Sequence, residues 1–140
     1  MRKWRIIQTL VVSATLAVAM GGAARAFSYS GSVSRDGYLR GQGYGNFYRT
    51  GYNTAKLTST LADMRKDGTR TFSDAKGYAP NKYFGVQSGR RADGESWYAR
   101  MADKTGYSGG AMVGYTGYVK ICQDVSLAPD WCSSEDHGDL

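Results

Sequence analysis

Side chains that could carry out catalysis are sparse in this sequence of 140 residues. The one histidine, His137, is the fourth residue from the end, in a region where chains usually fray. A Ser-His-Asp or Cys-His site would have to use it, and a cysteine would have to be reduced to act as a nucleophile. We therefore predict no catalysis of this kind and no enzyme.

Carboxylates offer a second kind of chemistry, because paired Asp or Glu side chains hydrolyse glycosidic bonds. Those that precede the acidic C-terminal segment are Asp36, Asp63, Asp67, Asp74, Asp93, Glu95 and Asp103. Asp36, Asp67 and Asp93 are each followed by glycine, so turns explain them. A small secreted hydrolase that uses carboxylates remains the alternative function.

Calcium binding by Asp63 and Asp67, with Asp74 nearby, is a further alternative. Calcium takes about six to eight oxygen ligands, and the spacing of an EF-hand loop is absent from this sequence. We therefore predict no metal and no cofactor.

Cys122 and Cys132 are the two cysteines of the chain, and we predict that they form a disulfide. Two cysteines cannot complete a four-ligand zinc site, and their separation is not the C-x-x-C redox spacing. The bridge would close a loop of about ten residues and stabilise the fold by roughly 3 kcal/mol. It would hold the C-terminal loop against the preceding strand.

Aromatic residues are abundant: the chain has eleven Tyr, three Trp and four Phe. Exposed Tyr and Trp are flat and rigid with one polar tip, which suits them to binding, including stacking on the sugar rings of a cell wall. The alternative is that a β-sandwich with few Leu and Ile fills its core with aromatic rings. The candidate binding residues are Tyr44, Phe47, Tyr48, Tyr52, Arg90, Arg91, Trp97 and Arg100.

Residues 1–26 have the pattern of a secretory signal peptide. Basic residues precede an apolar run over 6–20, and Ala24-Arg25-Ala26 is a cleavage site of the A-x-A type. We expect cleavage after Ala26, secretion to the extracellular space and no stable membrane insertion afterwards. An uncleaved membrane anchor is the lesser alternative.

Removal of this segment would lower the net charge from +6 to +2, because four basic residues leave with it. The basic character is then mostly a targeting feature, and we predict no nucleic-acid binding, which needs a clustered basic surface. The remaining charge is uneven, since residues 27–123 carry a net charge of +7 and residues 124–140 carry five acidic and no basic side chains.

Short stretches of alternating polar and apolar residues predict an all-β fold. Strands are expected over 27–35, 54–64, 69–75, 82–88, 96–102 and 111–124. A short helix near 57–64 is the alternative for the second stretch. Asp-Gly pairs at 36–37, 67–68 and 93–94 predict tight turns.

Glycines are expected to break several of these stretches. Gly41, Gly43 and Gly45 should interrupt any strand within 38–51, and a second break is expected over 76–81. The whole pattern predicts a small antiparallel β-sandwich or barrel of about six or seven strands with one C-terminal disulfide. The single β domain would cover 27–133, and 134–140 would form an acidic flexible tail.

Two segments resemble a group of small secreted actinobacterial proteins of unassigned function. Asp63-Met64-Arg65-Lys66-Asp67-Gly68 is similar to their D-x-x-x-D-G turn, although Met64 stands where the group usually has Thr. Cys122-Gln123-Asp124 followed by Cys132-Ser133 is similar to their C-x-D…C ending, and Trp97 lies between the two segments. The resemblance implies a secreted β domain from a Gram-positive, high-GC bacterium, and it implies no activity.

These observations do not identify a ligand. The expected function is a secreted binding or interaction module whose partner is a cell-wall polymer or another secreted protein, which includes a bacteriocin-like or inhibitor role. A structural matrix component is a further alternative to the carboxylate hydrolase.

Overall fold

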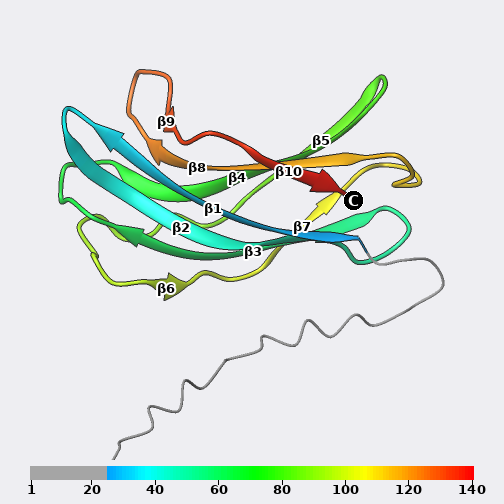
Figure 1. The fold of residues 1–140 in the computed structure, drawn as a ribbon, viewed down its shortest axis with the longest axis horizontal. Coiled ribbons are helices and arrows are strands. Elements are labelled where there is room, and N and C mark those ends of the chain that lie inside the picture. The colour runs from blue at the N-terminus through cyan, green and yellow to red at the C-terminus, as the bar shows by residue number, and fades with distance from the viewer. Residues whose placement is uncertain (1–24) are drawn as a thin grey trace, which may run out of the picture.

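The computed structural model describes residues 25–140 and consists of two packed antiparallel sheets, as predicted (Figure 1). Sheet A contains β1 (Ala26–Arg35), β2 (Tyr38–Arg49), β3 (Thr54–Asp63), β6 (Ala99–Arg100) and β7 (Lys104–Tyr107). Sheet B contains β4 (Arg70–Ala79), β5 (Lys82–Gln87), β8 (Thr116–Asp124), β9 (Trp131–Cys132) and β10 (Asp136–Asp139). The predicted signal peptide lies outside the described residues except for Arg25 and Ala26.

Two-residue turns join β1 to β2 and β4 to β5. Asp36 and Gly37, between β1 and β2, have φ angles of 53° and 77°, the left-handed pair that a two-residue hairpin requires. Asn81, with a φ of 65°, plays the corresponding part between β4 and β5. The predicted strands over 27–35 and 54–64 are confirmed as β1 and β3, and the helix alternative for the latter is wrong.

The glycines of β2 do not interrupt it, so that prediction is wrong: β2 spans 12 residues and is the longest strand of the described chain. Gly41, Gly43 and Gly45 alternate along its inner face, where a Cβ atom would collide with residues of the facing or neighbouring strands. At Gly43 the obstacle is the Leu61 side chain, and at Gly45 it is the backbone carbonyl of Thr58. The glycines therefore permit close packing.

Four further differences from prediction concern where strands begin and end. β4 continues through the expected break and ends at Ala79, while the expected strand over 96–102 is reduced to Ala99–Arg100. β7 lies within 104–110, where no strand was predicted. The long strand predicted from 111 begins at Thr116, because Gly114 has a φ of 73°, which an extended strand cannot include.

The C-terminal segment is a strand where we expected a flexible tail. β10 pairs with β8 from Asp136↔Val119 to Asp139↔Thr116, and Leu140 is buried in the core. The predicted disulfide between Cys122 and Cys132 is confirmed, and it joins β8 to β9 as direct partners.

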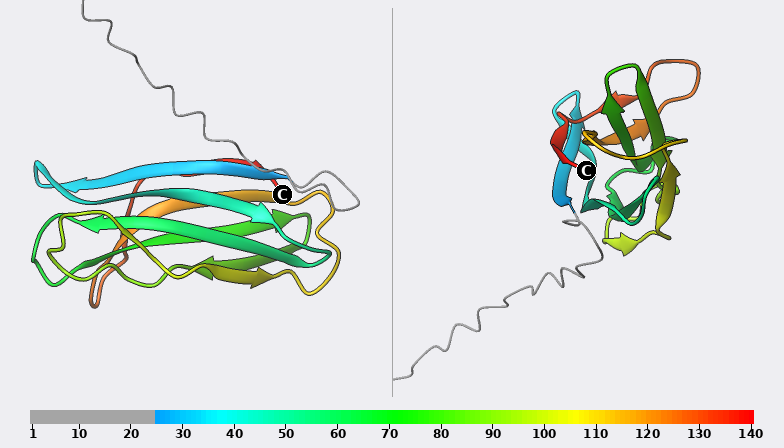
Figure 2. Two further views of the ribbon diagram at one scale, coloured as in Figure 1. Left: turned by 90° about the horizontal axis from the view of Figure 1, so that it is seen from below. Right: turned by 90° about the vertical axis from the view of Figure 1, so that its right-hand side faces the viewer.

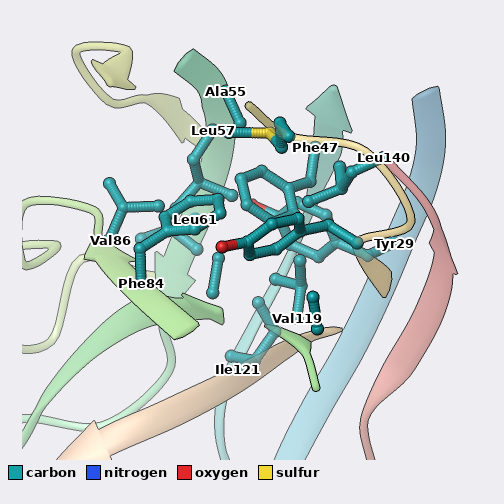
Figure 3. Packing of buried hydrophobic residues seen from close by; sticks show 14 of the residues in the cluster. Tyr29, Phe47, Ala55, Leu57, Leu61, Phe84, Val86, Val119, Ile121 and Leu140 are labelled. Carbon is teal, nitrogen blue, oxygen red and sulfur yellow. The ribbon is translucent and has the colours of Figure 1, made fainter. Parts of the chain in front are cut away.

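The core lies between the sheets and combines aliphatic with aromatic side chains (Figure 3). Phe47 is fully buried at its centre, with ring centroids 6.1 Å from Phe27 and 6.2 Å from Phe84. Tyr29 enters the same core and donates its hydroxyl to the Thr58 carbonyl at 2.7 Å. Some aromatic residues therefore fill the core, and others remain for the surface.

Candidate functional site

The outer face of sheet A carries mainly hydroxyl and amide side chains. Figure 2, left, shows the strands of this sheet from that side. Strand alternation produces this face, because Tyr29 and Val33 point into the core and the serines between them point out. We define the outer face by the side chains that share this orientation: Ser28, Ser30, Ser32 and Ser34 of β1, Gln42, Tyr44, Asn46 and Tyr48 of β2, Lys56, Thr58 and Thr60 of β3, and Arg100 of β6.

Register fixes the order of side chains across this face. Ser30 pairs with Tyr44, Tyr44 with Thr60, and Thr60 with Arg100, so four strands contribute to one row. A parallel row runs through Ser28 and Asn46, whose side chains are hydrogen-bonded at 2.8 Å. Within each row, the side chains therefore stand at the spacing of the strands, about 4.8 Å.

Tyr44 and Tyr98 form an aromatic pair at the centre of this face. Their ring centroids are 5.3 Å apart with an interplanar angle of 61°. Tyr44 is 48% exposed and Tyr98 is 46% exposed, so each ring leaves about half of its surface free for a ligand. Thr60 and Arg100 lie in the same row as Tyr44 and provide hydrogen-bond donors beside the rings.

Three of the predicted binding residues share this face: Tyr44, Tyr48 and Arg100. Arg100 is exposed and forms an ion pair of 2.7 Å with Asp103. Phe47 is not a surface residue, since it is 0% exposed and its neighbours Asn46 and Tyr48 point the other way.

The remaining predicted residues lie elsewhere. Tyr52 is exposed in the loop between β2 and β3. Arg90 covers the Phe72 ring at 3.9 Å on the outside of sheet B and pairs with Asp124, so it belongs to the opposite sheet. Arg91 stands 5.2 Å from the exposed Trp97 ring, in the segment between β5 and β6.

Tyr98 was not among the predicted residues. It follows Trp97 directly and precedes β6, and the pairing of β6 with β3 brings it beside Tyr44. Trp97 and Tyr98 are adjacent, and successive side chains of an extended segment point to opposite faces. The sequence therefore indicates that at least one of the two rings faces outward.

The three Asp-Gly turns and Arg40 form an electrostatic cluster at one end of the sandwich. Arg40 reaches Asp67 at 2.6 Å and Asp36 at 3.6 Å, and Asp93 accepts hydrogen bonds from the backbone N–H groups of Asp67 and Gly68. Burial acts to raise the pKa of Asp67, but hydrogen bonds from Thr69 and Arg40 outweigh it and hold that pKa below its ordinary value. These carboxylates stabilise the turns.

Within residues 25–140, no three His, Cys, Asp or Glu side chains are grouped closely enough to hold a metal ion. Asp63 and Asp67 are engaged instead by Gly94 N–H and Arg40, respectively. No helix in this part of the chain is long and apolar enough to cross a membrane.

A shallow, open groove runs along the seam between β1 and the C-terminal segment, lined by Ser28, Tyr29, Ser30, Glu135, Asp136 and His137. Asp136 accepts the backbone N–H of Ser30 at 2.8 Å, and Glu135 is 3.4 Å from the Lys76 ammonium. These contacts cover the edge of β1.

The chain matches no family model, no curated protein and no solved structure.

Proposed function

We propose that this protein is a secreted binding module that holds cell-wall polysaccharide on the outer face of sheet A. The observation that carries the proposal is the half-exposed Tyr44–Tyr98 pair, set among the hydroxyl and amide side chains of the outer face. A sugar ring has apolar C–H faces that pack on aromatic rings, and a rim of hydroxyls that exchange hydrogen bonds with polar side chains. The outer face supplies both kinds of contact.

The disulfide between Cys122 and Cys132 supports an extracellular location, because such bonds persist in oxidising compartments. The predicted signal peptide over 1–26 leads to the same proposal. Extracellular placement would expose the outer face to wall polymers.

Co-sedimentation of the purified protein with purified bacterial cell walls, at low and at high salt, tests the proposal. We expect binding to survive high salt, because stacking and neutral hydrogen bonds are not screened, whereas attraction between basic residues and an anionic polymer is. Loss of binding at high salt would indicate the electrostatic mode instead. Absence of binding at both salt concentrations would contradict the proposal and redirect the search to a secreted protein partner.

Three matched variants locate the surface. Tyr44→Ala and Tyr98→Ala should each weaken binding about threefold to tenfold, the range that one aromatic contact supplies. Tyr83→Ala is the control, because Tyr83 is 75% exposed on β5 of the opposite sheet. Equal losses in all three variants would contradict the assignment to sheet A.

A further inference from the structure

A buried polar cluster on the inner side of sheet B contains a hydroxyl, an amide and a carboxylate in contact. Thr71 of β4 and Gln123 of β8 are direct register partners and are both 0% exposed. Gln123 Nε2 is hydrogen-bonded to Thr71 Oγ1. Because Nε2 is bonded to the amide carbon Cδ, the Thr71 hydroxyl oxygen stands beside an acyl carbon.

Asp63, at the end of β3, supplies a carboxylate to this pair. Thr71 donates its hydroxyl to Asp63 Oδ2 at 3.0 Å, and Gln123 Nε2 is 3.4 Å from the same oxygen. The backbone N–H of Gly94 donates to the other carboxylate oxygen at 2.9 Å. Asp63 is 0% exposed, and burial raises its pKa against the lowering effect of hydrogen bonds from Gly94, Thr71 and Gln123. A buried carboxylate of this kind is a stronger base than an exposed one.

Two neighbours complete the arrangement. The Thr69 hydroxyl oxygen lies 2.6 Å from Asp67 Oδ1 and 2.5 Å from Gln123 Oε1, and its one proton serves one of these acceptors at a time. Rotation of that proton to Oε1 would stabilise the amide oxygen that carries negative charge during attack. Gly41 of β2 faces the pair, and a Cβ atom there would collide with both Thr71 and Gln123. The glycine therefore leaves the space that the two side chains occupy.

We propose that Thr71 and Gln123 react with each other to form an intramolecular ester, with Asp63 as the catalytic base. Asp63 takes the proton from Thr71 Oγ1 as that oxygen bonds to Gln123 Cδ, and Thr69 stabilises the developing charge on Oε1. The Cδ–Nε2 bond then breaks, and the proton passes from Asp63 to the leaving nitrogen. One hydroxyl and one primary amide give one ester and one ammonia, so no oxidant or other reactant is required.

The fold favours this step in two ways. The backbone register holds the hydroxyl against the amide, which removes the entropic cost of bringing the two groups together. Full burial excludes the water that would hydrolyse the ester. The product would join β4 to β8 one residue from Cys122, so an ester and a disulfide would secure consecutive positions of β8. The inference is independent of the proposed binding function.

Tryptic peptide mass spectrometry of the full-length chain tests the proposal. Trypsin cuts after Arg70, Lys76 and Lys120, so Thr71 falls in the peptide 71–76 and Gln123 in the C-terminal peptide 121–140. We expect these peptides to be recovered as one species, lighter than their sum by the mass of one ammonia. Hydroxylamine, which cleaves esters, should release the peptide 71–76 unchanged. Separate recovery of both peptides at their unmodified masses, from folded protein kept at neutral pH, would overturn the proposal.

Variants identify the reacting groups by the same mass readout. Thr71→Val keeps the shape but lacks the nucleophile, and Asp63→Asn lacks the base, so neither should show the linked species. Thr71→Ser restores a hydroxyl and should restore the link. Ser59→Ala removes a different buried hydroxyl and should leave the link intact. A linked species that persists in Thr71→Val would overturn the assignment of Thr71 as the reacting hydroxyl. The masses of the wild-type peptides show whether the ester forms even if Asp63→Asn does not fold.

Discussion

Replacement of Gly43 by alanine should destabilise the protein, although alanine is normally favoured over glycine inside a strand. A Cβ atom at this position would collide with the Leu61 side chain and stand 3.1 Å from both the Ile121 Cδ1 atom and the Thr60 carbonyl oxygen. Extra atoms in a packed core cost about 1–3 kcal/mol. Reduced freedom of the unfolded chain returns about 0.4–1 kcal/mol, so the net loss should be about 1–2 kcal/mol.

Gly85→Ala provides the matched control, because the nearest atom to its Cβ would be the Ala75 carbonyl oxygen at 3.8 Å. That variant should be unchanged or slightly more stable. Thermal and urea unfolding, followed by circular dichroism, measure both variants. The Gly43→Ala loss corresponds to a fall in Tm of roughly 4–8 °C for a domain of this size.

A double variant separates packing from other effects. Leu61→Val shortens the side chain that the new Cβ meets, so Gly43→Ala combined with Leu61→Val should cost less than the sum of the two single variants. Equal stability of Gly43→Ala and Gly85→Ala would refute the reasoning that the β2 glycines allow the sheets to approach.

Three further results are expected. Reduction of Cys122–Cys132 should lower the free energy of unfolding by about 3 kcal/mol, measured with urea in the presence and absence of reductant, and an unchanged midpoint would contradict the role of the bridge. Tyr29→Phe should cost about 1–3 kcal/mol, because the lost hydroxyl contacts the Thr58 carbonyl in the core; urea unfolding measures it, and a neutral result would contradict that contact. The pKa of Asp67 is lowered in the folded state, so the ionised side chain stabilises the fold above its unfolded pKa of about 4, and this stabilisation is lost as the pH falls through the folded value. The free energy of unfolding should therefore fall less steeply below about pH 4 in Asp67→Asn than in wild type. Parallel pH profiles of the two proteins would contradict this expectation.

The hairpin between β1 and β2 was predictable because the conformation of a tight turn depends on the residues within it. The glycine of each Asp-Gly pair has a left-handed backbone, and at Asp36-Gly37 both residues do, which forms the hairpin between β1 and β2. The pairs at 67–68 and 93–94 instead lie in connections between strands that do not pair with each other. The disulfide was predictable for a similar reason, since two cysteines in one chain have one intramolecular pairing.

Glycines inside strands were misinterpreted because their meaning depends on what lies opposite. Gly77 continues β4 and pairs with Phe84, whose ring occupies the space of the missing side chain. Gly114, in contrast, has a left-handed backbone and ends the extended stretch before β8. The sequence shows the same residue in both cases, and long-range packing decides between them.

The candidate site was predictable only where alternation within one strand determines it. Tyr44 and Tyr48 share a parity, so both belong to one face, and the same rule places Phe47 in the core. The position of Arg100 and Tyr98 beside Tyr44 depends on the pairing of β6 with β3, which joins segments about forty residues apart. No local pattern reports such a pairing.

A nuclear magnetic resonance titration with soluble cell-wall fragments tests the central claim most directly. Fragments of the wall glycan are added to isotope-labelled protein, and the chemical shifts of the backbone amides are followed. We predict shifts concentrated on β2 and β3 around Tyr44 and Thr60, and at Tyr98, with little change at Tyr83. Shifts confined to sheet B, or no shifts at saturating fragment, would contradict the assignment of a glycan-binding surface to sheet A.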